Sequence, residues 1–109
     1  MSNTIKEISV HELLRMTTDK EDFQLIDVRE PDEYAFANLS GELIPMNQIP
    51  DRVDEIEKNK KVIIMCRSGQ RSAHVAAYLQ AAHGMNEVYN LAGGILAYSD
   101  EIDNTIPKY

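Results

Sequence analysis

The stretch that decides the fold is VIIMCRSGQRS, residues 62–72. Its first part, Val62–Met65, is an apolar run without polar alternation, which is typical of a strand buried on both faces of a parallel sheet. An Ala- and Leu-rich pattern then fills residues 72–83 and stops at Gly84, as expected of a helix and its end. Cys66 therefore falls at the carboxyl end of a central strand, where a tight turn opens a helix. Ligands bind at this edge of an open α/β sheet.

This position favours a thiolate at Cys66. The first turn of a helix leaves backbone N–H groups without partners, and the helix dipole adds partial positive charge. Arg67 and Arg71 bring two full positive charges nearby, and each of these effects lowers a thiol pKa below its reference of about 8.5. A lone cysteine is otherwise most often a small buried hydrophobe, and two arginines a solvated pair. The strand, turn and helix around Cys66 favour a reactive thiol over that simpler interpretation.

Length and composition indicate one domain over residues 1–109, large enough for a core without disulfides or a structural metal. A single cysteine excludes an internal disulfide and a zinc site of several thiolates, and the three histidines lack metal-ligand spacing, so we assign no metal. The net charge of −7 argues against nucleic-acid binding. Residues 1–7 contain no apolar signal core, and no apolar run approaches the ~20 residues of a membrane span. We therefore expect a cytoplasmic protein without membrane contact.

The remaining segments alternate between strand and helix patterns. Strands are expected at residues 23–28, 42–45 and 87–91. Ser9 and Glu12 fit a capping box that opens a short helix, and Pro31 suits the first position of another. This alternation predicts an α/β protein with a parallel, doubly wound sheet.

Two later segments complete the predicted elements. Residues 50–57 are interpreted as a charged helix with Val53 and Ile56 facing inward. Residues 92–98 are interpreted as a Gly-rich turn into a helix, and the paired glycines are a weak phosphate signal that a tight turn explains better.

Two charged residues lie late in the predicted strand 23–28 or just after it. Asp27 follows apolar residues, so it needs a hydrogen-bond partner if it is buried. It could act as a general base, but a thiolate of low pKa needs none, so we favour a structural role that ties down a neighbouring loop. Arg29 could pair with an acidic neighbour or face the site, and the sequence does not separate these alternatives.

The sequence resembles the rhodanese-like sulfurtransferase family over essentially its whole length. Three separate stretches carry the resemblance in the same order, LIDVREPDEY at 25–34, CRSGQRS at 66–72 and NLAGGI at 90–95. The resemblance implies a five-stranded parallel sheet flanked by helices, and a cysteine that carries sulfur as a persulfide. It implies that Cys66 is the nucleophile. It also implies that amides and side chains of the loop hold the outer sulfur, the loop residues being Arg67, Ser68, Gly69, Gln70, Arg71 and Ser72.

The chain departs from the family pattern at two places. It has ANLSGE at 37–42 where the family usually has Gly-His-Ile-Pro-Gly-Ala, and Tyr98 where the family usually has Trp. Asn38 therefore stands in a turn whose packing we expect to differ. The tail, residues 93–109, is similar to the end of rhodanese domains fused behind ubiquitin-activating-type adenylyltransferases. That similarity implies a protein sulfur acceptor or an adenylyltransferase partner that binds in trans.

Three functions compete. The first is transfer of sulfane sulfur from thiosulfate or a persulfide donor to a thiophilic acceptor, such as cyanide or a thiol, in two half-reactions without a cofactor. The second is a Cys-based phosphatase or arsenate reductase. Enzymes of that kind resemble one another in a motif with five residues between Cys and Arg, whereas only four residues separate Cys66 from Arg71. The third is a non-enzymatic binding module, against which the presence of Cys66 argues.

Overall fold

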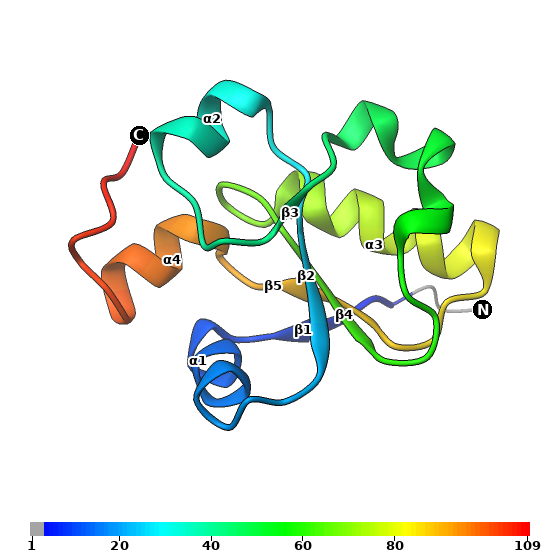
Figure 1. Ribbon diagram of the computed structural model, residues 1–109, viewed down its shortest axis with the longest axis horizontal. Coiled ribbons are helices and arrows are strands. Elements are labelled where there is room, and N and C mark those ends of the chain that lie inside the picture. The colour runs from blue at the N-terminus through cyan, green and yellow to red at the C-terminus, as the bar shows by residue number, and fades with distance from the viewer. Residues whose placement is uncertain (1–3) are drawn as a thin grey trace.

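The computed structural model describes residues 4–109 and consists of one five-stranded sheet with helices on both faces (Figure 1). All strand pairs are parallel, and the spatial order is β1-β5-β4-β2-β3. The strands are β1 (Lys6–Ile8), β2 (Phe23–Asp27), β3 (Glu42–Leu43), β4 (Lys61–Met65) and β5 (Val88–Leu91). The parallel, doubly wound α/β sheet predicted from the sequence is thereby confirmed.

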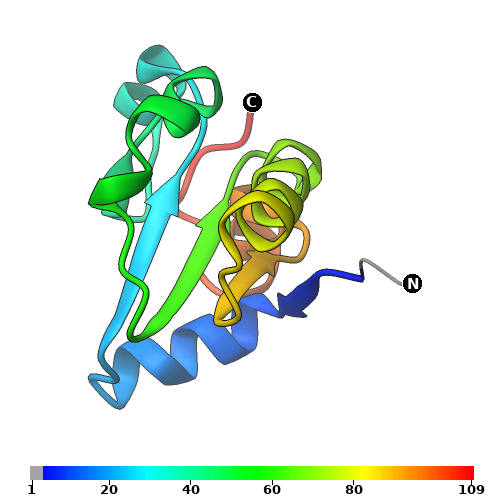
Figure 2. The same cartoon turned by 90° about the vertical axis from the view of Figure 1, so that its right-hand side faces the viewer.

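Helices cover the sheet in two layers (Figures 1 and 2). One face packs against α3 (Gln70–His83) and two short 3-10 helices, η1 (Met46–Asp51) and η2 (Val53–Glu55). The opposite face packs against α1 (Val10–Thr18) and α4 (Gly94–Glu101). The remaining helix, α2 (Pro31–Phe36), follows the carboxyl end of β2.

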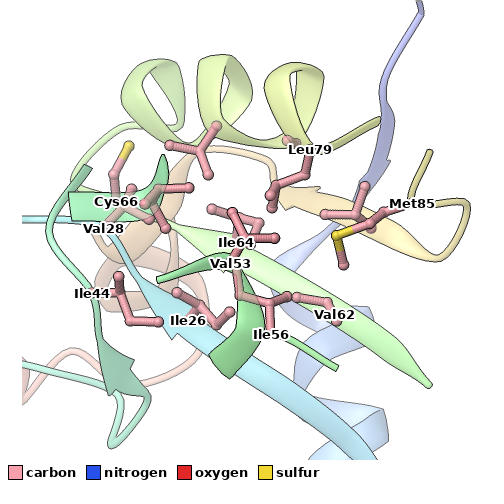
Figure 3. Close-up of a cluster of buried hydrophobic side chains, with 14 residues drawn as sticks. Ile26, Val28, Ile44, Val53, Ile56, Val62, Ile64, Cys66, Leu79 and Met85 are labelled. Carbon is pink, nitrogen blue, oxygen red and sulfur yellow. The ribbon is translucent and has the colours of Figure 1, made fainter. Parts of the chain in front are cut away.

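Strand β4 forms the centre of both cores. Val62, Ile64 and Cys66 join the cluster under α3, whereas Ile63 and Met65 join the cluster under α1 and α4. This alternation explains why residues 62–65 of the strand are all apolar, since both faces are buried there. Figure 3 shows Cys66 at one end of the first cluster, with its sulfur turned away from the other labelled side chains.

Two elements differ from the sequence predictions. The charged helix predicted at residues 50–57 is wrong, because η1 and η2 are separate 3-10 helices and the backbone at Arg52, with φ −126°, leaves the helical region between them. Val53 and Ile56 nevertheless point inward as predicted. The sequence reading also missed β1, whose short length and polar residues give no strand pattern.

Helix starts agree with the sequence in outline. Ser9 caps α1 by accepting the Glu12 N–H at 3.1 Å, but the Glu12 carboxylate binds Arg15 rather than completing the predicted capping box. Helix α3 begins two residues before the predicted start at Ser72, because Gly69 adopts φ +102° and turns the chain early into the helix.

Between residues 4 and 109, no helix is both long and apolar enough to cross a membrane. Within the same residues, no group of three or more His, Cys, Asp or Glu side chains is arranged to hold a metal ion. Met1–Asn3, which belong to the segment interpreted as lacking a signal core, lie outside the described residues.

Candidate active site

Cys66 lies directly after β4, inside a ring of hydrogen-bond donors formed by the start of α3. Its side chain is buried, and three donors converge on its sulfur. The Gly69 N–H lies 3.1 Å from Sγ, the Ser72 N–H 3.4 Å and the Ser72 hydroxyl 3.3 Å. Such groups stabilise negative charge on sulfur at a helix N-terminus.

The hydrogen bonds offset the effect of burial on the thiol. Burial by itself raises the pKa of Cys66, but hydrogen bonds from the Ser72 hydroxyl and from the N–H groups of Ser72, Gly69 and Ser68 outweigh it. The pKa of Cys66 therefore lies below its ordinary value. A lowered pKa of Cys66 was predicted from the sequence, although much of the lowering was attributed to Arg67 and Arg71.

Asn90 competes with the sulfur for the Ser72 hydrogen. Ser72 Oγ lies 2.5 Å from Asn90 Oδ1, and a hydroxyl has one hydrogen to donate. Asn90 is itself fixed, because its Nδ2 donates to Gly69 O at 3.2 Å and to Glu7 Oε2 at 2.9 Å. No role was predicted for Asn90. The signal that the sequence offers is a polar residue between apolar residues in a strand.

The back of the loop rests on the start of α4. Ile95 N–H donates to Cys66 O at 3.0 Å, and Leu96 N–H donates to Arg67 O at 3.1 Å. Gly94 permits this contact, because a Cβ at this position would lie 2.4 Å from Cys66 O and its φ is +61°. The paired glycines thus form the tight turn that the sequence suggested, and that turn supports the reactive loop.

Both loop arginines have partners other than the sulfur. Arg71 makes two hydrogen bonds to Glu33 of α2, from Nη1 to Oε1 at 2.7 Å and from Nη2 to Oε2 at 2.9 Å. Arg67 Nε donates to Tyr109 O at 2.6 Å, and its guanidinium lies 5.2 Å from the centre of the Tyr109 ring. The pKa of Arg71 is raised, mainly by Glu33 and to a lesser degree by Cys66.

Asp27 and Arg29 form a buried ion pair. Arg29 Nη2 donates to Asp27 Oδ2 at 2.8 Å, and both side chains are fully buried. The same guanidinium donates to Ala37 O at 2.7 Å and to the Tyr109 hydroxyl at 2.8 Å. Of the two alternatives for Arg29, the structure therefore shows pairing with an acidic neighbour, and Asp27 orients it toward the loop after α2.

The structure brings only part of the predicted loop set to the sulfur. Ser68, Gly69 and Ser72 contribute hydrogen bonds to it. The side chain of Gln70 is exposed. Two cavities of about 360 and 260 Å³ lie elsewhere, and no loop residue lines either of them. The chemistry around Cys66, rather than cavity size, identifies this site.

The two departures from the family pattern lie outside this loop. Asn38 closes its own turn, since its side chain binds Tyr34 O at 3.1 Å and the Ser40 N–H at 2.8 Å. Tyr98 packs against the core beneath α1 and α4, and burial raises its pKa.

Comparison with known proteins places the chain in a family. The rhodanese-like domain family matches residues 9–101. The chain is 40% identical over 113 residues to the "Rhodanese-like/PpiC domain-containing protein 12, chloroplastic" of Arabidopsis thaliana, covering 96% of this chain and 38% of that protein. It is 42% identical over 96 residues to a protein named "Sulfurtransferase" from Allochromatium vinosum, covering 87% and 89%. The chain thus spans well under half of the plant protein and most of the bacterial one.

Two further comparisons concern structure and a multidomain relative. A crystal structure of a rhodanese-like domain protein from Staphylococcus aureus superposes with a TM-score of 0.81 at 34% identity, covering 96% of this chain and 99% of that one. The "Adenylyltransferase and sulfurtransferase UBA4" of Candida glabrata is 30% identical over 96 residues, which are 78% of this chain and 22% of that protein. With this fold, this loop and these relatives, the chain belongs to the rhodanese-like domain family.

Proposed function

We propose that the protein is a sulfurtransferase that carries sulfane sulfur on Cys66. The observation that carries the proposal is the convergence of the Gly69 and Ser72 N–H groups and the Ser72 hydroxyl on one buried thiol of lowered pKa. These donors suit a sulfur anion in the same way that an oxyanion hole suits an oxygen anion. Relatives named sulfurtransferase support the same class of reaction.

The reaction has two steps. In the first, the Cys66 thiolate attacks the sulfane sulfur of thiosulfate or of a persulfide, and the new Sγ–S bond forms as the donor's S–S bond breaks. The electron pair of the broken bond leaves with sulfite or with the donor thiolate. In the second, cyanide or a thiolate attacks the outer sulfur, and the electron pair of the Sγ–S bond returns to Cys66. The loop from Arg67 to Ser72 holds the outer sulfur between the steps through its backbone N–H groups and the Ser72 hydroxyl, and no cofactor takes part.

A protein acceptor is part of the proposal. Relatives named as a sulfur carrier and as an adenylyltransferase and sulfurtransferase point to sulfur transfer between proteins. We propose that this chain delivers sulfur in trans to such a protein or to a small thiol. A free thiolate nucleophile suits a reducing compartment, and we place the protein in the cytoplasm.

Intact-protein mass spectrometry tests this function. After incubation with thiosulfate or with a cysteine persulfide, the wild type should gain the mass of one sulfur and lose it when cyanide is added. Cys66→Ser should gain none, while His74→Ala, on the exposed side of α3, should load like the wild type. Circular dichroism establishes that both variants fold.

The same samples address the phosphatase alternative. We expect slow or undetectable hydrolysis of an aryl phosphate, because a tetrahedral oxyanion needs more donors than the short loop offers. Efficient aryl phosphate turnover without sulfur uptake would contradict the sulfurtransferase proposal.

A further inference from the structure

Glu33 holds an ionised carboxylate against the reactive loop, through Arg71. Its carboxylate is only 15% exposed, and it accepts hydrogen bonds from both Arg71 nitrogens, from the Glu30 N–H at 3.0 Å and from the Tyr109 hydroxyl at 2.7 Å. The Arg71 hydrogen bonds are the main reason that the pKa of Glu33 falls to about 2. This carboxylate is therefore ionised throughout the physiological range.

Tyr109 completes the same cluster from the segment that follows α4. Its hydroxyl lies between Arg29 and Glu33, accepting from the first and donating to the second. Its backbone oxygen accepts hydrogen bonds from Arg67. A hydrogen bond from Ser99 of α4 to Ile106 O, at 2.6 Å, holds the segment that delivers Tyr109. The segment thus lies beside the reactive loop (Figure 1).

The guanidinium groups of the loop are consequently already engaged in hydrogen bonds. Two nitrogens of Arg71 are bound to a carboxylate, and two nitrogens of Arg67 are bound to a carbonyl oxygen. The backbone N–H groups around Cys66 Sγ, by contrast, lie on the sulfur itself. The site therefore has hydrogen-bond donors in place for one sulfur atom, but few guanidinium nitrogens remain free to bind a larger anion.

The two donor classes make different demands on such a site. Thiosulfate is a dianion, and its three sulfonate oxygens need donors beyond those around the transferred sulfur. A thiol persulfide presents its outer sulfur without a sulfonate group. The Glu33 carboxylate occupies two nitrogens of Arg71, so these donors are not available to the sulfonate oxygens of thiosulfate.

We propose that Glu33 and Tyr109 are specificity-determining residues that direct the site toward persulfides of thiols and away from thiosulfate. This inference rests on the proposed sulfurtransferase function. In the favoured reaction, Cys–S⁻ and R–S–SH give Cys–S–SH and R–S⁻, so the electron pair of the donor S–S bond leaves on the donor thiolate. The disfavoured reaction, Cys–S⁻ and S–SO₃²⁻ giving Cys–S–S⁻ and SO₃²⁻, needs donors for three sulfonate oxygens, and the nearby guanidinium nitrogens are already bound to Glu33 and Tyr109.

The test compares two donors in four proteins. Initial rates of Cys66 loading are measured with thiosulfate and with cysteine persulfide in the wild type, Glu33→Gln, Tyr109→Phe and Asp32→Asn. Asp32 is the matched control, because it is an exposed carboxylate next to Glu33 on the same helix. The substitution Asp32→Asn removes the same charge from the chain without changing a residue of the Glu33 cluster.

We expect Glu33→Gln to raise kcat/KM for thiosulfate about tenfold, through a lower KM, while kcat/KM for the persulfide changes less than about threefold. Tyr109→Phe removes the hydroxyl that holds the Glu33 carboxylate, so it should loosen the Glu33–Arg71 pair and move the ratio in the same direction by a smaller factor, and Asp32→Asn should leave the ratio unchanged. Because Tyr109→Phe keeps the Glu33 carboxylate, it keeps the test valid if Glu33→Gln does not fold.

Three outcomes would overturn the inference. The first is a wild type that prefers thiosulfate, the second an equal loss with both donors in Glu33→Gln, and the third a ratio that moves as much in Asp32→Asn. These outcomes differ from failure of the proposed function, in which neither donor adds sulfur to Cys66 in the wild type.

Discussion

At the scale of single residues, the Ser72 hydroxyl decides how acidic the thiol is. Ser72→Ala removes the side-chain donor that does most to lower the pKa of Cys66, so we expect that pKa to rise. The rate of sulfur uptake follows the thiolate fraction, which increases with pH through the pKa. The profile of Ser72→Ala should therefore lie at higher pH than that of the wild type.

Thiolate absorbance against pH gives the measurement. Ser68→Ala is the control, because it keeps the backbone N–H that faces the sulfur and should leave the pKa of Cys66 in place. A Ser72→Ala midpoint equal to the wild-type midpoint would mean that the Ser72 hydrogen remains on Asn90 Oδ1 when the thiolate forms.

Local sequence predicts the surroundings of Cys66 but not the partners of Arg67 and Arg71. The strand, the small loop residues and the helix are adjacent in the chain, so the geometry of the cradle follows from local rules. Glu33 and Tyr109 are distant in sequence from Arg71 and Arg67 and reach them only through the tertiary fold. Such contacts leave no local pattern in the sequence.

At the scale of elements, the junction between the reactive loop and α4 depends on Gly94. Gly94→Ala forces an unfavourable backbone conformation and also places a Cβ against Cys66 O and Arg67 O, so we expect a loss of roughly 3 kcal/mol in the free energy of unfolding. Gly84→Ala is the matched control. Its φ of +62° is nearly the same, but nothing lies within 4 Å of the added Cβ, so its loss should be roughly 1 kcal/mol.

Urea denaturation of the two variants separates conformational strain from the clash. Equal losses at the two glycines would show that the loop moves away from α4 at little cost. A larger loss at Gly94 should be accompanied by slower sulfur uptake, because the clash displaces the backbone on either side of Cys66.

Elements with a strong periodic pattern were predicted well, and those held by tertiary contacts were not. Strand β4 and helix α3 have unambiguous patterns because burial on one or both faces dictates their residues. The segment that forms η1 and η2 was predicted as one helix from its charges and from Val53 and Ile56. Pro50 lies inside η1, and the backbone at Arg52 departs from helical geometry, so the segment bends as two turns.

At the scale of the whole molecule, Glu33 joins three distant parts of the chain, and the acid stability of the protein should depend on it. Its pKa is about 2 in the folded protein, whereas an unperturbed glutamate titrates near pH 4.3. The lowered value means that ionised Glu33 stabilises the fold above the unfolded pKa. That contribution is lost as the pH falls from about 4.3 toward 2.

Glu33→Gln should therefore be less stable than the wild type at pH 7, and the difference should shrink on acidification. Free energies of unfolding from urea titrations at pH 7, 5 and 3 provide the comparison, with Asp32→Asn as the charge control. A difference that stays constant between pH 7 and pH 3 would show that the loss comes from packing rather than from the ionised carboxylate.

The strand order of the sheet also means that paired strands are synthesised at different times. In the register of β1 and β5, Glu7 lies opposite Asn90, and 83 positions separate them along the chain. A nascent chain leaving the ribosome therefore exposes β1 long before its neighbour β5 exists, whereas β2 and β4 are both present before β5 is made. Asn90 and α4, which brace the reactive loop, also emerge after Cys66. The thiol is thus translated before the residues that complete its surroundings.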